Sequence, residues 1–259
     1  MKAADIFSLK ARVALVTGAS SGLGQQFARA LADNGAAVAL VARRADRLSA
    51  LQKSIEAAGG RALAIEADVT DRAAMARAFD TAEKAFGTVT ILVNNAGIAQ
   101  SSRRAIEVSA EEWRKVLSVD LDAVFYNAQE AARRMLAAKK AGAIINIASV
   151  LGFGVSKGVA AYAVAKAAVV QVTKALAVEL AFKGVRVNAI APGWFVTEIN
   201  DKYLAGEAGE ALKRQIPAGR FGTDGDLDGA LLLLASDAGS YISGATIVVD
   251  GGQVVMITG

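Results

Sequence analysis

The sequence predicts an α/β protein in which one parallel sheet of seven strands is covered by helices on both faces, a doubly wound arrangement. Short runs rich in β-branched residues alternate with longer helical patterns along the chain, which is typical of successive βαβ units. The runs are almost continuously apolar, as expected for strands that are buried on both faces of a parallel sheet. A length of 259 residues is in the range of one large α/β domain.

The seven strands are expected at 12–18, 36–42, 62–68, 89–95, 142–149, 184–192 and 245–250. Apolar periodicity and flanking Gly or Asp residues predict the connecting helices at 22–34, 44–58, 71–86, 109–138, 159–183 and 224–236. Because the chain has only 2 prolines and no low-complexity tract, it offers no linker at which a domain boundary would fall. We expect residues 1–259 to form a single domain.

The absence of two residue types restricts the chemistry. The chain contains neither cysteine nor histidine. This excludes disulfides, Ser-His-Asp and Cys-His catalysis, and metal sites built from cysteine or histidine. We expect no metal centre, and any proton transfer must fall to tyrosine, lysine, aspartate or glutamate.

Charge and hydropathy bear on partners and location. The net charge of +4 comes from 29 basic and 25 acidic residues spread along the chain, without the basic stripe of a nucleic-acid-binding protein. We therefore expect no nucleic acid partner, and the charge only slightly favours an anionic ligand. The N-terminal stretch has no signal-peptide pattern, and no later segment offers about 20 uninterrupted apolar residues. A cytoplasmic protein with no membrane contact is expected.

The expected helix at 159–183 is apolar on almost every side. A helix of this kind is buried. A deep core position would explain the pattern, but the outer helices of a doubly wound sheet are normally half exposed. Burial against another copy of the chain is therefore favoured, and we expect a homo-oligomer.

A glycine-rich turn, TGASSGLG at 17–24, joins the first expected strand to the first expected helix. In this context such a turn binds a dinucleotide pyrophosphate: Gly18 permits the tight turn, Gly22 the close approach of backbone to phosphate, and Gly24 the contact of helix with strand. A tight turn without a ligand remains an alternative when the motif is taken alone. The candidate cofactor residues here are Gly18, Ser20, Ser21, Gly22, Leu23 and Gly24.

Two arginines, Arg43 and Arg44, follow the second expected strand. In dinucleotide-binding folds a carboxylate at this point binds the ribose 2'-hydroxyl of NAD, whereas a cation accommodates the 2'-phosphate of NADP. Guanidinium groups suit phosphate. NADP(H) is therefore the preferred cofactor and NAD(H) a possible one. Either arginine could instead be a solvated residue at the start of a surface helix.

Tyr162 and Lys166 lie four residues apart on an expected helix, so their side chains share one face. A nearby ammonium favours the phenolate form of a tyrosine, which makes the pair a usable proton relay. Ser149 ends the fifth expected strand at the carboxyl edge of the sheet, where ligands bind in this type of fold. With no histidine to activate it, Ser149 is suited to hydrogen-bond a reacting oxygen; a serine that merely caps the strand end is the alternative.

Taken together, these residues resemble the short-chain dehydrogenase/reductase superfamily, and the resemblance covers the whole chain. The motifs that carry it are Thr17 to Gly24, Asn94-Asn95-Ala96-Gly97, Ser149, Tyr162-x3-Lys166, Pro192-Gly193 followed by Thr197, Tyr241-x2-Gly244, and Asp250-Gly251-Gly252. Each is weak alone, but their order on the expected elements argues against coincidence. The resemblance implies a Rossmann fold and hydride transfer between nicotinamide and a carbonyl carbon, with Tyr162 as general acid or base.

The resemblance also implies further roles. Ser149 would fix the substrate oxygen, Lys166 would also bind the nicotinamide ribose, and Asn94 would be structural. Cofactor contacts are implied for Asp68 and Val69 at the adenine, for Asn95, Ala96 and Gly97 beside the ribose and nicotinamide, and for Pro192, Gly193, Phe195 and Thr197 at the nicotinamide. A homotetramer, or less often a dimer, is implied as well.

Asp120 is a departure from the family, which normally has an asparagine here that helps to hold a water behind the lysine. We count Asp120 among the catalytic candidates. An ionised carboxylate would pair with Lys166, stabilise its ammonium and weaken its pull on Tyr162. The expected consequence is an altered pH dependence rather than inactivity.

The segment 194–220 is expected to form a substrate lid. Apolar residues that could line a pocket are Trp194, Phe195, Tyr203 and Leu204 in this segment and Phe153 and Val155 after the fifth strand. They favour an apolar ketone or a 3-oxoacyl compound as substrate, although all six could instead pack the lid against the body. The alternatives are a polyol or sugar dehydrogenase and a protein that binds NADP(H) without turnover.

Overall fold

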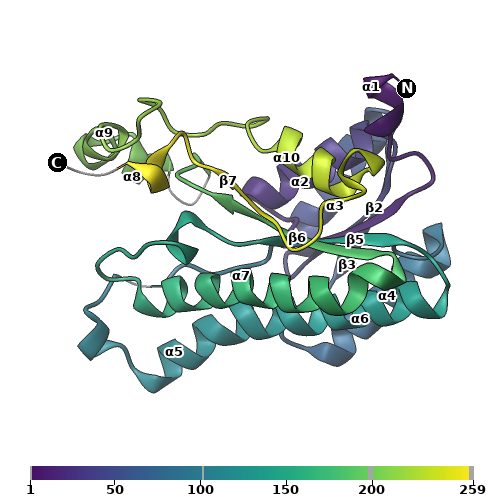
Figure 1. Cartoon of the computed structure of the whole chain (residues 1–259), viewed down its shortest axis with the longest axis horizontal. Coiled ribbons are helices and arrows are strands. Elements are labelled where there is room, and N and C mark those ends of the chain that lie inside the picture. Colours follow the sequence, from purple (N-terminus) through teal and green to yellow (C-terminus); the bar gives the residue numbers. More distant parts are fainter. Residues whose placement is uncertain (1, 101, 198–200, 257–259) are drawn as a thin grey trace.

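The seven strands form one parallel sheet in the order β3-β2-β1-β4-β5-β6-β7 (Figure 1). The structure is a computed structural model, and it describes residues 2–100, 102–197 and 201–256, without the side chains of 202, 203 and 208. The strands are β1 (Val13–Thr17), β2 (Ala37–Ala42), β3 (Arg61–Glu66), β4 (Ile91–Asn94), β5 (Gly142–Ile147), β6 (Val185–Pro192) and β7 (Thr246–Val249). The predicted doubly wound, seven-stranded Rossmann fold is confirmed.

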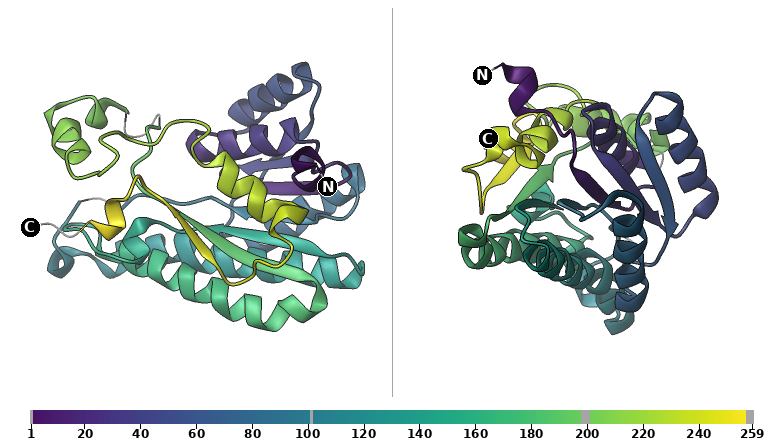
Figure 2. Two further views of the ribbon diagram at one scale, coloured as in Figure 1. Left: turned by 45° about the horizontal axis from the view of Figure 1, so that its top comes forward. Right: turned by 90° about the vertical axis from the view of Figure 1, so that its right-hand side faces the viewer.

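Helices cover both faces of the sheet (Figure 2). One face carries α2 (Gly22–Asp33), α3 (Ala45–Ala57) and α10 (Asp228–Ala235); the other carries α4 (Arg72–Phe86), α6 (Ala123–Ala137) and α7 (Ala160–Leu180). The remaining helices are α1 (Ala3–Ile6), α5 (Ala110–Leu117), α8 (Asp201–Leu204) and α9 (Glu207–Lys213).

Strand β1 shows why both faces are apolar. Its alternate side chains enter different halves of the core: Ala14 and Val16 pack with α2 and α10, whereas Leu15 packs with α4 and α6. A strand in this position must be hydrophobic at every residue, because successive side chains point to opposite faces. All five residues of β1 are buried. The continuous apolar runs of the sequence therefore correspond to the central strands.

The order of the strands also places the ligand site. The first half of the chain builds the sheet outward from β1 to β3, and the second half builds it in the opposite direction from β4 to β7. The connections after β1 and β4 consequently depart toward opposite faces. Doubly wound proteins bind nucleotides at the carboxyl ends of two such neighbouring strands, and we refer to this expected binding position as the crevice.

The expected helix at 109–138 is interrupted by a wide π-helical turn at Ser118–Asp122 between α5 and α6. Ser109 caps the start of α5 by accepting a hydrogen bond from Glu112 N–H at 3.0 Å. The turn adds a residue to the helical repeat and directs Asp120 into the interior, where it is fully buried. Turns of this kind are rare and often mark functional positions.

Helix α7 is the longest of the described helices and is apolar along most of its length. Together with the 3-10 turn that follows, Ala160–Lys183, it has the length and mean hydropathy of a membrane-spanning helix, which the sequence prediction did not anticipate. The same features occur in core helices of soluble proteins, and α7 packs along the sheet with Ala161, Val169 and Ala177 buried. Val178 and Phe182 are nevertheless 81% and 80% exposed.

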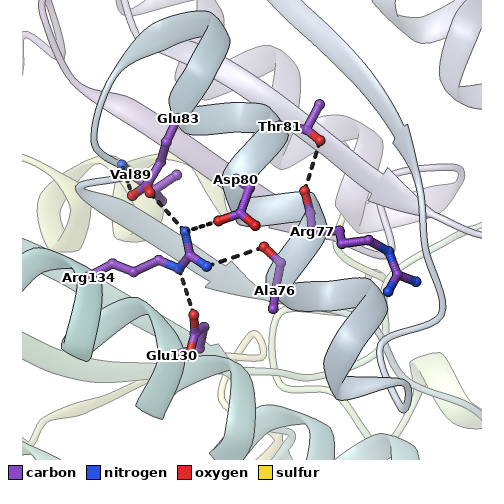
Figure 3. A network of polar contacts seen from close by, with 8 residues as sticks. All are labelled: Ala76, Arg77, Asp80, Thr81, Glu83, Val89, Glu130 and Arg134. Carbon is purple, nitrogen blue, oxygen red and sulfur yellow. Dashed lines mark hydrogen bonds and ion pairs between the residues drawn. The ribbon is translucent and has the colours of Figure 1, made fainter.

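A polar network joins α4 to α6 on the outside of the sheet (Figure 3). The Arg134 guanidinium donates to Asp80 at 2.7 Å, to Glu83 at 2.9 Å and to Glu130 at 2.7 Å. Burial alone would lower the pKa of Arg134, but hydrogen bonds to the three carboxylates outweigh it and raise that pKa. The Arg134 side chain is only 19% exposed, so this network is less screened by water than an ordinary surface ion pair.

Replacing Arg134 with glutamine is expected to lower the free energy of unfolding by about 1–3 kcal/mol, because three clustered carboxylates lose their shared counter-ion. The measurement is urea unfolding followed by circular dichroism. Arg77→Gln is the matched control, since Arg77 lies on α4 and points away from the network (Figure 3). Equal losses in both variants would contradict a stabilising role for the network.

Candidate active site

The Thr17 side chain joins the two strands that border the crevice. Its hydroxyl donates to the Val93 carbonyl at 3.3 Å and accepts from the backbone N–H groups of Asn95 and Ala96 at 3.0 and 3.1 Å. Asn95 returns the contact, because its amide nitrogen donates to the Thr17 carbonyl at 3.0 Å. The end of β1 and the loop after β4 are thereby held as one unit.

The glycine-rich turn has the backbone that its sequence predicts. Gly18 and Gly22 adopt φ values of +67° and +52°, a region that side chains with a Cβ disfavour. A Cβ on Gly24 would lie 2.2 Å from the Gly18 carbonyl oxygen, so only glycine lets α2 begin this close to the strand. Leu23 packs against the hydrophobic core under α2. The turn presents the N-terminus of α2 to the crevice, which is an anion-binding arrangement.

The two predicted arginines lie in different places. Arg44 extends over the glycine-rich turn, where its guanidinium donates to the Ser20 hydroxyl at 2.9 Å and to the Ser21 hydroxyl at 2.6 Å. Arg43 is largely exposed and lies 3.8 Å from the Asp68 carboxylate at the end of β3. The structure thus brings Arg44, rather than Arg43, to the turn.

Asp68 belongs to the same rim. Hydrogen bonds from the Thr70 N–H and hydroxyl lower the pKa of its carboxyl, and Arg43 lowers it further by a smaller amount. Val69 next to it packs on the core under α4. Both residues follow β3, the strand next to β2, and their contact with the adenine stays a prediction.

Asn94 has the structural role expected of it. Its amide donates to the Val124 carbonyl at 3.1 Å and to the Asn146 side chain at 3.0 Å, and Asn146 donates in turn to the Thr173 hydroxyl. These buried contacts connect β4 with α6, β5 and α7. Helix α7 is therefore anchored to the sheet by a polar network as well as by apolar packing.

Tyr162 and Lys166 share one face of α7, as predicted. The Lys166 ammonium lies 5.4 Å from the centre of the Tyr162 ring and donates to the Ile147 carbonyl, the last of β5, at 3.0 Å. Ser149 follows two residues later, buried, with its hydroxyl accepting from Leu151 N–H at 3.1 Å. Ser149 therefore caps the turn after β5, as in the alternative of a capping serine, and it lies two residues after the Ile147 carbonyl that binds Lys166.

Gln100 is a residue that sequence reasoning missed. Its side-chain oxygen accepts from the N–H groups of Ala161 and Tyr162 at 2.8 and 3.3 Å. Helix α7 needs this remote cap because its own N-cap residue, Val159, has no polar side chain. In the sequence, the lack of a polar N-cap residue at Val159 indicates that another side chain must cap this helix. It does not indicate which residue does so.

Asp120 is buried directly behind Lys166. One carboxylate oxygen accepts from Ile98 N–H at 2.8 Å, and the other lies 3.7 Å from the Lys166 ammonium without a hydrogen bond of its own. Gly97 packs against the same carboxylate. Burial raises the pKa of Asp120 above its ordinary value, and Lys166 and the Ile98 N–H offset only part of that rise.

A carboxyl whose pKa is higher in the folded than in the unfolded protein contributes most stability below its unfolded pKa of about 4, and that contribution is lost as the pH rises through the folded value. Asparagine cannot ionise. Relative to the unchanged protein, the free energy of unfolding of the Asp120→Asn variant is therefore expected to rise between pH 4 and pH 8. The rise is about 1.4 kcal/mol for each pH unit by which the pKa of Asp120 in the folded protein exceeds its unfolded value.

Thermal or urea unfolding over this pH range measures the difference. Asp122→Asn is the matched control, because Asp122 is exposed in the same π-helical turn. If the two proteins differed in free energy of unfolding by the same amount at every pH, the Asp120 carboxyl would have the same pKa in the folded and unfolded states, which contradicts the prediction.

The segment after β6 forms the opposite wall of the crevice. Pro192 ends the strand, and Gly193 donates its N–H to the Val249 carbonyl at 3.0 Å. A Cβ on Gly193 would lie 2.7 Å from that of Asp250, which explains the glycine. Thr197 faces the glycine-rich turn, 3.4 Å from where a Cβ on Gly22 would stand. The structure thus brings together the beginning and the end of the predicted cofactor site.

The aromatic residues predicted for the substrate pocket pack mostly within the lid. Phe195 is buried and its ring fills the space over Gly222. Leu204 is buried with Ile216 and Phe221, and Trp194 packs against this cluster. The packing alternative therefore holds for these residues. Phe153 and Val155 are exposed, and the Tyr203 side chain and residues 198–200 lie outside the described residues.

Comparison with known proteins gives full-length matches. A family model described as enoyl-(acyl carrier protein) reductase matches residues 18–253. Gluconate 5-dehydrogenase of Gluconobacter oxydans strain 621H is 39% identical over 256 residues, 98% of either chain. The 3-oxoacyl-(acyl-carrier-protein) reductase of Staphylococcus aureus strain Mu50 is 40% identical over 241 residues, 93% of this chain and 97% of that protein.

A solved structure agrees. The gluconate 5-dehydrogenase of Burkholderia cenocepacia J2315 in complex with NADP and tartrate superposes with a TM-score of 0.93 at 36% identity, covering 99% of this chain and 100% of the other. The match with relatives over nearly the whole length agrees with the strand order and with the placement of Tyr162 and Lys166. The chain belongs to the short-chain dehydrogenase/reductase family of oxidoreductases.

Proposed function

We propose that the protein is an NADP(H)-dependent oxidoreductase that interconverts a ketone and a secondary alcohol, with Tyr162 as the general acid or base. The observation that carries the proposal is the buried Lys166 ammonium, held by the Ile147 carbonyl between the Tyr162 ring and the strand end that bears Ser149. A cation fixed in this place stabilises negative charge that develops on a neighbouring tyrosine oxygen as its proton leaves. Proton transfer is then available at the edge of the sheet where the cofactor crevice opens.

The crevice suits a dinucleotide with a 2'-phosphate. Gly18 and Gly22 shape the turn for close backbone approach, and Gly24 lets α2 begin at the turn, where its N-terminal N–H groups would hold a pyrophosphate. Ser20, Ser21 and Arg44 form a cationic, hydroxyl-rich corner beside the end of β2. When bound there, NADPH would supply hydride to a carbonyl carbon, and NADP+ would accept hydride from the alcohol in the reverse direction.

The chain's own residues supply the proton and hold the oxygen. In reduction, the Tyr162 hydroxyl gives its proton to the oxygen that forms as the carbonyl carbon accepts hydride, and in oxidation the phenolate takes it back. Ser149 donates a hydrogen bond to the same oxygen and fixes its position. Lys166 stabilises the tyrosine charge left behind. Ser149 and Lys166 are buried, so their contacts act in a setting of low dielectric where each is strong.

We further propose that Asp120 positions Lys166. Its unpartnered oxygen faces the ammonium at 3.7 Å, and its other oxygen is fixed by Ile98 N–H. While the carboxyl is protonated it resembles the amide of an asparagine, and once ionised it competes with Tyr162 for the charge of Lys166. The pH dependence of ketone reduction by the Asp120→Asn variant reports this role, and an unchanged profile would leave Asp120 as a structural substitute.

For the substrate we favour a ketone or alcohol that carries polar groups, such as a sugar acid. Relatives named gluconate 5-dehydrogenase match over nearly the whole chain, and Phe195 and Leu204 are used in packing the lid instead of lining an apolar pocket. A 3-oxoacyl compound is the second candidate. It is supported by the Staphylococcus aureus relative and by the exposed Phe153 and Val155 after β5.

The remaining expectations stand as part of this proposal: one domain over 1–259 with 194–220 as its lid, a cytoplasmic location, and a homotetramer or dimer. The outward face of α7 supports the assembly, because Val164, Val178 and Phe182 are exposed there in the isolated chain. Association of such apolar helices buries them.

Replacing both Arg43 and Arg44 with glutamine is expected to weaken NADPH binding by about 10- to 100-fold, because charge-assisted hydrogen bonds to the 2'-phosphate are lost. NADH binding should stay within about threefold. Fluorescence or calorimetric titration with both cofactors measures this. The single variants divide the effect, with the larger share expected at Arg44, which already lies on Ser20 and Ser21.

Lys53→Gln is the control for the cofactor titration, since Lys53 is exposed on α3, the helix that follows Arg43 and Arg44. Equal affinity of the unchanged protein for NADPH and NADH would contradict the preference for NADP(H). A loss of affinity for both cofactors alike in the arginine variants would mean that they disturb the turn rather than a phosphate contact.

Tyr162→Phe is expected to lower kcat for ketone reduction at least about 100-fold, because the proton donor is lost, while NADPH binding is retained. Steady-state assays with a panel of ketones, sugar acids and 3-oxoacyl thioesters measure the loss. Tyr241→Phe is the matched control, since Tyr241 is fully exposed. If the unchanged protein binds NADPH but turns over no compound of the panel, the non-catalytic binding protein becomes the better explanation.

A further inference from the structure

A second hollow lies in the loops that precede the catalytic helix. It is a cavity of about 310 Å³ lined by Ser102, Arg103, Arg104, Glu107, Lys157 and Gly158. We propose that this cavity is the subsite for a negatively charged end of the substrate, a carboxylate or a phosphate. The proposal rests on the proposed function and specifies the substrate class of that site.

The cavity adjoins the first turn of α7. The loop after β4 and the loop after β5 meet there, because Arg103 donates its N–H to the Gly158 carbonyl at 3.1 Å. Gly158 has a φ of +85° and passes so close to Ser102 that a Cβ would lie 2.6 Å from the serine hydroxyl. Two residues before Ser102, Gln100 caps the turn of α7 that bears Tyr162. The cavity is therefore lined by the two loops that meet at the N-terminal end of α7, near the turn that bears Tyr162.

The charge of the lining is mostly positive. Three of the six residues are cations and one, Glu107, is a carboxylate. Helix α7 begins at the same place without any acidic residue in its first turn, so the positive end of its dipole is not neutralised there. Anions are attracted to such a combination, and cationic or purely apolar groups are not.

The cations are available for a ligand. Arg103 lies 3.8 Å from Glu112 and Arg104 lies 3.3 Å from Glu107, with the two arginine side chains 58% and 80% exposed. Ion pairs this exposed contribute little and exchange readily. Lys157 is exposed and takes part in no ion pair within the described part of the chain. An incoming carboxylate or phosphate would gain at least one unpaired ammonium and one or two guanidinium forks.

Two kinds of substrate carry the required charge. A small hydroxy or keto acid bears a carboxylate, and a thioester carrier arm bears phosphate. Both can be offered as matched pairs: 4-oxocyclohexanecarboxylate against its methyl ester, and 3-oxobutyryl coenzyme A against the N-acetylcysteamine thioester of the same acyl group. In each pair the carbonyl to be reduced is kept and the anionic group is removed, so the pair that shows a charge effect identifies the source.

The test is the triple variant Arg103→Gln, Arg104→Gln, Lys157→Gln, with Lys53→Gln, Arg77→Gln as a control that removes exposed cations elsewhere. For the anionic member of one pair, KM is expected to rise about tenfold or more in the triple variant, with kcat within about twofold. The neutral member and the NADPH affinity should not change. Raising the ionic strength should weaken the binding of the anionic substrate to the unchanged protein and should have little effect on its binding to the variant.

A binding measurement separates this proposal from the proposed function. Cyclohexanecarboxylate has no carbonyl to reduce, and calorimetry of the NADPH-saturated protein with this acid and with its methyl ester reports the subsite without turnover. Tighter binding of the acid that disappears in the triple variant supports the subsite even if no ketone is reduced. Equal binding of acid and ester, or an unchanged KM for both anionic substrates in the triple variant, overturns it whether or not the protein is an active reductase.

Discussion

The hydrogen bonds of the Thr17 side chain hold together the point on which the site depends. The direction in which strands are added to the sheet reverses between β1 and β4, so the chain leaves the ends of these two strands toward opposite faces. Beyond the strand ends, no backbone pairing of the sheet in the described part of the chain holds the two loops together. One hydroxyl joins them by bonding Val93, Asn95 and Ala96. Because the Asn95 side chain then fixes the carbonyl of Thr17, the glycine-rich turn and the loop after β4 keep one relative position, and the cofactor crevice has rigid walls.

The proposed catalytic side depends on two ionisable groups that are buried next to each other. Lys166 and Asp120 are both buried, although burial of either charge is costly unless it is paired. Their 3.7 Å separation and the single hydrogen bond from Lys166 to Ile147 provide part of the compensation. The π-helical turn that brings Asp120 inward is a local departure from regular helix, and such departures are kept where they position a functional group.

How much the sequence could predict differs between these two sides. The strands and the glycine-rich turn follow from local patterns, because apolar runs and the demands of Gly18 and Gly24 are properties of neighbouring residues. The π-helical turn within 109–138 has no apolar period of its own, so the sequence predicted one continuous helix. Likewise, the choice of Arg44 over Arg43 for the turn, and the cap that Gln100 provides for α7, depend on loops that meet only in the folded chain.

The contrast between local patterns and contacts formed only in the folded chain also separates the cofactor side of the site from the substrate side. The cofactor side is built from backbone geometry: positive φ at Gly18 and Gly22, the N-terminus of α2, and carbonyl and N–H groups at strand ends. The proposed substrate side consists of side chains in the described parts of 98–109, 153–159 and 194–220, which the sheet supports but does not shape. Loops of this kind tolerate change without loss of the fold. In our proposal the reaction type is therefore set by the scaffold, whereas the charge and size of the substrate would follow from exposed residues such as Arg103, Lys157 and Phe153.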